Sequence, residues 1–188
     1  MTSPLIGGIG LLERAIGYTL GSLLLITPEA MTRPTPCQQW DLHALLRHMN
    51  DSLAALHEAV DCGHVELEPA SGEPAVDLVA ALRDRACHLL GAWTNGDGRQ
   101  LVSIADRTLT SVIVTSAGAI EIAVHGWDVA RACGQDRPIP AALAEELLPL
   151  TALFVTAGDR PGRFDPPVEP TRMCTPGERL VAYLGREP

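Results

Sequence analysis

Lysine is absent from this chain of 188 residues, and all 14 of its basic residues are arginines. A Schiff-base enzyme needs a lysine amine, and so does the phosphate-binding loop of nucleotide hydrolases, so the sequence excludes both. Aromatic residues make up only 4% of the chain, too few for a surface on which nucleic-acid bases stack. The net charge of −9 points the same way, because binding to phosphates needs clustered cations. We therefore expect no nucleic-acid partner.

A Cys-x-x-Cys pair is absent: the five cysteines are an odd number at wide spacings, and no secretory signal precedes them. The apolar stretch from Leu5 to Ile26 is long enough for a membrane span. Glu13 and Arg14 lie at its centre, however, where charges are costly. The sequence therefore predicts reduced thiols, a cytoplasmic location and no membrane partner.

Apolar residues (46%) and charged residues (20%) are present in the proportions of a soluble globular domain. Helical periodicity predicts helices over about 5–26, 41–60, 75–93, 116–133 and 141–157, and a short one over 177–184. TNGDG (94–98) is the clearest turn signal, and the runs 100–104 and 110–114 predict a small hairpin or an irregular crossover. Residues 158–176 contain five prolines and little periodicity, so we expect an irregular segment there.

The most informative motif is Glu121-Ile-Ala-Val-His125-Gly-Trp-Asp128. Residues four apart share a helix face, so Glu121 and His125 can bind one metal ion. Asp128 lies on the same face and can either orient His125 or reach the metal itself. The flanking residues are apolar, and a buried carboxylate needs a metal or an arginine as partner. Spacing alone favours the arginine, because Glu-x-x-x-His is common on amphipathic helices.

A third metal ligand would have to come from another helix. His48 lies in the second predicted helix, where His43 and His57 point to other faces, and His88 lies beside leucines in the third. A lone histidine on an apolar face is usually a core residue, so the pattern prefers His48 only slightly. Trp127 is expected to pack in the core rather than to line a pocket.

Two longer stretches resemble a known family. PTPCQQWDLHALLRHMNDSLAAL (34–56) and AIEIAVHGWDVARACG (119–134) resemble the DinB-like superfamily. More narrowly, they resemble the actinobacterial branch that includes the N-terminal domains of mycothiol-dependent maleylpyruvate isomerases. FDPPVEP (164–170) and PGERLVAYLGREP (176–188) resemble the tail of that branch.

The fold implied by this resemblance is all-α, a DinB-like four-helix bundle with a long crossover and an irregular C-terminal tail. The metal-binding bundle would occupy residues 1–158, and the tail, packed on the bundle, residues 159–188.

The site implied by the resemblance is a divalent metal held by His48, Glu121 and His125. One carboxylate and two histidines leave coordination positions open, as in catalytic zinc sites, so zinc is the first expectation, with nickel or iron as alternatives. In thiol-using members of the family, the metal binds the thiol of a small cofactor such as mycothiol as a thiolate. The implied activity is S-transfer to a small electrophile or thiol-assisted isomerisation. Maleylpyruvate itself is not expected as the substrate, because the isomerases use a further C-terminal domain.

Two other residues are candidates for roles at this site, and two other functions stay open. Asp128 is a candidate catalytic residue, and Arg131 is a candidate cofactor-binding residue, with Arg186 as a second possible anion clamp. The alternatives are a non-catalytic metal- or ligand-binding bundle and a metal-dependent hydrolase with Asp128 as general base. An open cavity at the metal would distinguish a catalyst or ligand binder from a closed structural site. The expected partner is a small-molecule substrate, and the sequence leaves a homodimer possible.

Overall fold

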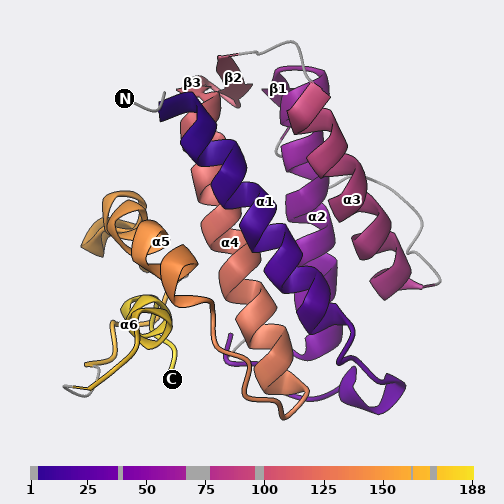
Figure 1. Ribbon diagram of the computed structural model, residues 1–188, viewed down its shortest axis with the longest axis vertical. Coiled ribbons are helices and arrows are strands. Elements are labelled where there is room, and N and C mark those ends of the chain that lie inside the picture. Colours follow the sequence, from indigo (N-terminus) through magenta and orange to yellow (C-terminus); the bar gives the residue numbers. More distant parts are fainter. Residues whose placement is uncertain (1–3, 38–39, 67–76, 96–99, 162, 170–172) are drawn as a thin grey trace.

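The computed structural model describes residues 4–37, 40–66, 77–95, 100–161, 163–169 and 173–188, and it is mostly helical (Figure 1). Its α-helices are α1 (Pro4–Leu23), α2 (Leu42–Asp61), α3 (Leu78–Asn95), α4 (Ser111–Ala132), α5 (Ala141–Phe154) and α6 (Pro176–Tyr183). Two short 3-10 helices cover Pro28–Ala30 and Ala157–Asp159. The strands are β1 (His64–Val65), β2 (Leu101–Ile104) and β3 (Arg107–Thr110). The prediction of a helical fold is confirmed.

Side-chain caps fix where the helices begin. Asp41 accepts a hydrogen bond from the Ala44 amide (2.8 Å) ahead of α2, near the predicted helix start at residue 41. Asp77 does the same for the Ala80 amide (2.9 Å), and this cap starts α3 later than the predicted residue 75. Thr110 caps α4. Gly63 and Gly134 follow α2 and α4 with positive φ, the usual conformation of a glycine that ends a helix.

Helices α1 to α4 lie side by side and enclose the main core (Figure 1). Helix α1 packs along α4, α2 packs against α3 and α4, and α5 covers the other side of α4. The C-terminal ends of α2 and α3 lead to β1 and β2, which pair in parallel. Most of the connection between α2 and α3 lies outside the described residues, and the long crossover predicted for the bundle stays a prediction.

A three-stranded sheet of order β1-β2-β3 closes one end of the helices, a feature that an all-α prediction does not include. The run 100–104 supplies β2, but its antiparallel partner is 107–110 and not the predicted 110–114. Residues 111–114 are instead the first turn of α4. Val112, Ile113 and Val114 favour strands intrinsically, but the cap at Thr110 and burial along α4 override that preference. The predicted turn at 94–98 lies mostly outside the described residues.

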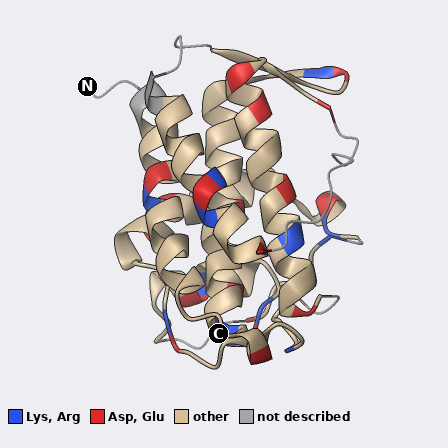
Figure 2. Cartoon of the chain, turned by 90° about the vertical axis from the view of Figure 1, so that its right-hand side faces the viewer, with Lys and Arg blue, Asp and Glu red and all other residues tan. Residues whose placement is uncertain are grey.

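Helix α4 is buried on nearly all sides, including residues 118–120 and 122–130. Among the described residues it is the one helix long and apolar enough to span a membrane, and 78% of its most apolar window is buried inside the protein. Such burial is typical of a core helix. Acidic and basic residues are interspersed over the coloured part of the chain in Figure 2. The absence of membrane and nucleic-acid partners stays a prediction.

Glycines allow α1 to lie close to α4. A β-carbon at Gly126, within the His125-Gly-Trp motif, would overlap the Thr19 hydroxyl and lie 3.1 Å from Thr19 Cα. A β-carbon at Gly8 would overlap Thr115 in the same way. Thr19 also donates a hydrogen bond to the Ile122 carbonyl (2.7 Å), which ties the two helices together next to Glu121. The close approach therefore fixes the part of α4 that carries the motif.

We expect Gly126→Ala to lower the free energy of unfolding by about 1–2 kcal/mol, because overpacking outweighs the gain in helix propensity. Gly17→Ala is the matched control on α1, since a β-carbon at Gly17 meets nothing within 4 Å. The control should raise stability by up to about 1 kcal/mol. Urea unfolding of both variants measures the difference, and equal effects would contradict the close helix contact.

Candidate metal centre

Three side chains from two helices meet between α2 and α4. His48 comes from α2, and Glu121 and His125 come from successive turns of α4. Each offers one ligand atom, and these atoms all lie within 4.8 Å of one another. The structure thus brings together the three residues expected to hold a metal, although their histidines are 77 positions apart in the chain.

Glu121 is the centre of the cluster. Its Oε1 lies 2.5 Å from His48 Nε2 and 3.3 Å from His125 Nε2, and it accepts a hydrogen bond from Ser52 Oγ (3.2 Å). Ligands bonded to a tetrahedral metal at about 2.1 Å stand roughly 3.4 Å apart, so the cluster can hold a cation with small side-chain shifts. The buried arginine that spacing alone favoured as the partner of Glu121 pairs instead with Asp128.

Glu121 and His125 shift each other's pKa values. Burial alone would raise the pKa of Glu121, but His125 and His48 hold it well below its usual value. Burial alone would lower the pKa of His125, but Glu121 and Asp128 raise it to about 9. An imidazole flanked by two carboxylates is therefore protonated at neutral pH in the metal-free protein. A divalent metal ion that bound to the cluster would displace the proton from the His125 Nε2 atom.

Asp128 and Arg186 orient His125 from behind. The Nδ1–H of His125 donates to Asp128 Oδ2 (2.9 Å), which leaves Nε2 directed at Glu121. Arg186 donates to both oxygens of Asp128, and the Asp128 side chain has no exposed surface. A carboxylate that holds the distal nitrogen of a histidine is the usual outer shell of a zinc site. Asp128 was expected either to orient His125 or to bind the metal itself, and the structure favours the first of these roles.

A cavity of about 620 Å³ opens onto the cluster. Its volume falls in the range of small-molecule sites. The side chains of His48 and Glu121 are 36% and 34% exposed, while that of His125 is 6% exposed. The apolar lining comes from three parts of the chain: the segment before α2, helix α4 and the C-terminal region. It includes Pro36, Trp40, Ala117, Ile120, Val124, Phe154, Val155, Phe164 and Leu184.

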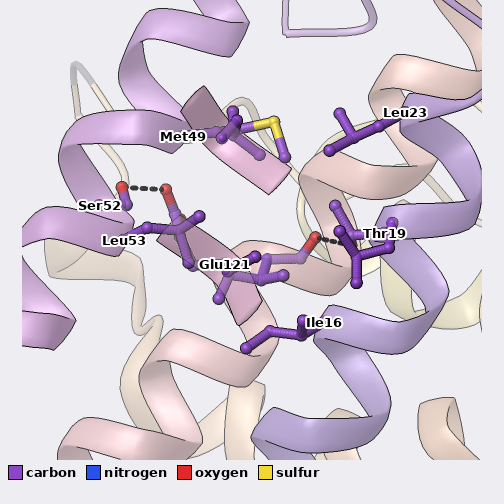
Figure 3. Close-up of a pocket in the computed structure, with 11 residues that line it drawn as sticks. Ile16, Thr19, Leu23, Met49, Ser52, Leu53 and Glu121 are labelled. Atoms are coloured by element: carbon purple, nitrogen blue, oxygen red, sulfur yellow. Dashed lines mark hydrogen bonds between the residues drawn. The ribbon is translucent and has the colours of Figure 1, made fainter. Parts of the chain in front are cut away.

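The other side of Glu121 is nearly closed. Figure 3 shows Glu121 beside Ser52, Met49 and Leu53 of α2, with Ile16, Thr19 and Leu23 of α1 around the same pocket. That pocket holds only about 10 Å³, the space of a single water molecule. Of these two spaces around Glu121, the large cavity is the one with room for a ligand larger than water.

Of the remaining predicted site residues, Asp128 and Arg131 do not line this cavity, whereas Arg186, the second possible anion clamp, does. Asp128 is buried beneath His125 and does not line it, so a role as the base beside a metal loses its support. Arg131 is exposed, and its guanidinium lies over the Trp127 ring at 5.4 Å from the ring centroid, so the structure does not bring it to the cofactor side. Trp127 is 5% exposed and packs in the core, as expected.

Sequence reasoning missed the aromatic and basic residues around the cluster. Trp40 packs on His48, with ring centroids 4.4 Å apart, and Arg163 and Phe164 reach the cavity from the tail. Trp40 stands inside the PTPCQQWD stretch, one residue before the cap of α2, so its place in that motif was the available signal. Nothing in the sequence pattern assigns Arg163.

A comparison with protein families gives one match. The family described as "mycothiol maleylpyruvate isomerase N-terminal domain" matches residues 13–130, which is more than half of the chain and includes all three clustered residues. No curated protein and no solved structure shows a significant match.

Proposed function

The chain belongs to the mycothiol maleylpyruvate isomerase N-terminal domain family, and on that premise we propose that it uses a divalent metal to activate a small thiol. The reaction would be S-transfer to a small electrophile or thiol-assisted isomerisation, with mycothiol as the thiol. One observation carries the proposal: His48, Glu121 and His125 converge on the wall of a cavity of about 620 Å³. We propose further that α1–α4 form the DinB-like four-helix bundle of this family and that the protein acts in the cytoplasm.

The metal would be held by the Nε2 atoms of His48 and His125 and by the Glu121 carboxylate. Zinc suits this donor set best, and nickel or iron is compatible with it. When bound, a divalent cation favours the thiolate form of a thiol and so supplies a strong nucleophile at neutral pH. Because His48, Glu121 and His125 all line the cavity, a metal held by them would face the cavity, where the thiol would bind.

The protein's own residues would position the reactants. Trp40 covers one face of His48, and Phe154 and Phe164 add apolar wall, so the thiol would lie against a partly apolar surface. Arg163 contributes a positive charge near the rim. A nucleophile and an electrophile confined in one cavity react with a lower entropic cost than in solution.

The test is an activity screen on protein purified without a histidine tag and loaded in turn with zinc, nickel and iron. Consumption of mycothiol is followed with monobromobimane, small electron-poor alkenes and epoxides as the electrophiles. We expect acceleration by the loaded protein, much weaker acceleration with cysteine in place of mycothiol, and none by His48→Ala. Metal-loaded protein that neither binds mycothiol nor accelerates its reactions would contradict the proposal. Binding without turnover would favour the ligand-binding alternative.

Trp40 offers a direct report of metal binding. Because its ring centroid is 4.4 Å from that of His48, we expect Co²⁺ to quench its fluorescence on binding. Trp40→Phe should remove most of the quenching, whereas Trp93→Phe, a change on α3 outside the cavity, should keep it. Quenching that survives in Trp40→Phe would place the ion elsewhere.

A further inference from the structure

The C-terminal tail enters the protein interior at Arg186. Arg186 is 7% exposed and Asp128 is fully buried, although they lie 58 positions apart in the chain. The guanidinium donates through Nε to Asp128 Oδ1 (3.0 Å) and through Nη2 to Asp128 Oδ2 (2.8 Å). Two parallel donors on one carboxylate fix its position and its plane, which a single bond would not do.

The turn that follows α6 sets the direction of the Arg186 side chain. Gly185 has a φ of +85°, and a β-carbon there would lie 2.7 Å from the Asp165 carbonyl oxygen. The Arg186 amide donates back to the Val181 carbonyl (3.0 Å), which closes the turn after the helix. Arg186 Nη1 also donates to the Leu184 carbonyl (3.2 Å). The backbone turn and the side-chain bonds together direct the guanidinium toward α4.

The contact continues from Asp128 to the metal cluster. Asp128 Oδ2 accepts from Arg186 Nη2 and also from His125 Nδ1 (2.9 Å), so one oxygen joins the tail to the histidine. Without Arg186, Asp128 would be a buried carboxylate with one remaining partner and a free choice of rotation. His125 would then lose the fixed acceptor that directs its Nε2 at Glu121.

We propose that Arg186 is a positioning residue of the metal centre, acting on His125 through Asp128, so that the tail is part of the site. This inference rests on the metal site proposed above. It differs from a purely structural ion pair because it requires a change at His125 when the arginine is removed.

The test compares Arg186→Met and Arg186→Lys with Arg160→Met. Arg160 is the matched control, since it holds the same tail through the Asp165 and Tyr183 carbonyls without touching Asp128. The first readout is the affinity and visible absorption spectrum of bound Co²⁺. The second, on metal-free protein, is the ¹⁵N–¹H signal of the His125 Nδ1–H group.

For Arg186→Met we expect a 10–100-fold loss of Co²⁺ affinity, an altered Co²⁺ spectrum and loss of the protected Nδ1–H signal. Arg186→Lys should be intermediate, because an ammonium group cannot donate in the planar two-pronged way. Arg160→Met should resemble the wild type in both readouts. Wild-type affinity and spectrum in Arg186→Met, or equal losses in Arg160→Met, would overturn the inference.

The experiment also covers two further outcomes: a variant that does not fold and a wild type that binds no metal. If Arg186→Met does not fold, Asp128→Leu/Arg186→Met replaces it, because this double variant leaves no buried unpaired charge. Wild-type Co²⁺ affinity in the folded double variant would overturn the inference, and a matching loss supports it. If the wild type binds no metal, the proposed function fails, while the Nδ1–H signal still decides whether Arg186 positions His125.

Discussion

His48→Ala and His125→Ala are each expected to abolish stoichiometric metal binding. The site has three protein ligands, and removal of one leaves two, too few for a stable zinc site. Elemental analysis of protein purified without a histidine tag measures the result directly. The wild type should also gain about 2.7 kcal/mol of stability when free Zn²⁺ is 100 times its dissociation constant, and both variants should lose that gain.

His57→Ala is the control for this experiment. His57 lies on the same helix as His48, but its Nδ1 lies 3.0 Å from Asp61 Oδ2 and it takes no part in the cluster. Its replacement should leave the metal content unchanged. Wild-type protein that holds no metal and cannot be loaded with zinc, nickel or iron would refute the site. The cluster would then be a hydrogen-bonded group, and the non-catalytic alternative would become the better account.

The part of the site that is local in sequence could be predicted from the sequence. Glu121 and His125 are one helical turn apart, so the helix period alone placed their side chains on one face. Asp128 followed from the same period, and its contact with His125 Nδ1 is a local contact within α4. The predicted start of a helix at residue 41 likewise agrees with the local cap at Asp41, whereas the cap at Thr110 starts α4 within a run that was predicted as part of a hairpin or crossover.

The parts that depend on packing between distant segments could not be derived in this way. Periodicity gave His48 little preference over other histidines, and the resemblance to a family singled it out. The pairing of Arg186 with Asp128 spans 58 positions and depends on the turn at Gly185. Arg131, which is nearer to the motif in sequence, lies on the exposed side of α4 instead. The β-branched residues 112–114 became helix because the cap at Thr110 starts α4 there and Val114 is buried, although Ile113 is exposed.

Asp128→Ala is expected to destabilise the metal-free protein by about 3–5 kcal/mol, because it leaves the Arg186 cation buried without its partner. Glu146→Ala is the matched comparison, since Arg14 also forms a two-pronged pair with Glu146, at 2.7 and 2.9 Å. The side chains of that pair are 44% and 51% exposed, and water replaces the lost partner there. Its loss should cost about 1 kcal/mol or less. Urea unfolding in the presence of a chelator measures both.

The double variant Asp128→Leu/Arg186→Met shows whether the instability of Asp128→Ala comes from the unpaired charge or from lost packing. It removes both buried charges and fills similar space, so it should recover most of the stability that Asp128→Ala loses. A double variant as unstable as Asp128→Ala would instead mean that the cost comes from packing around α6. If stability returns while Co²⁺ affinity stays low, the buried pair contributes little net stability, and its value to the protein lies in the orientation of His125. That separation of stability from metal binding is the result we expect.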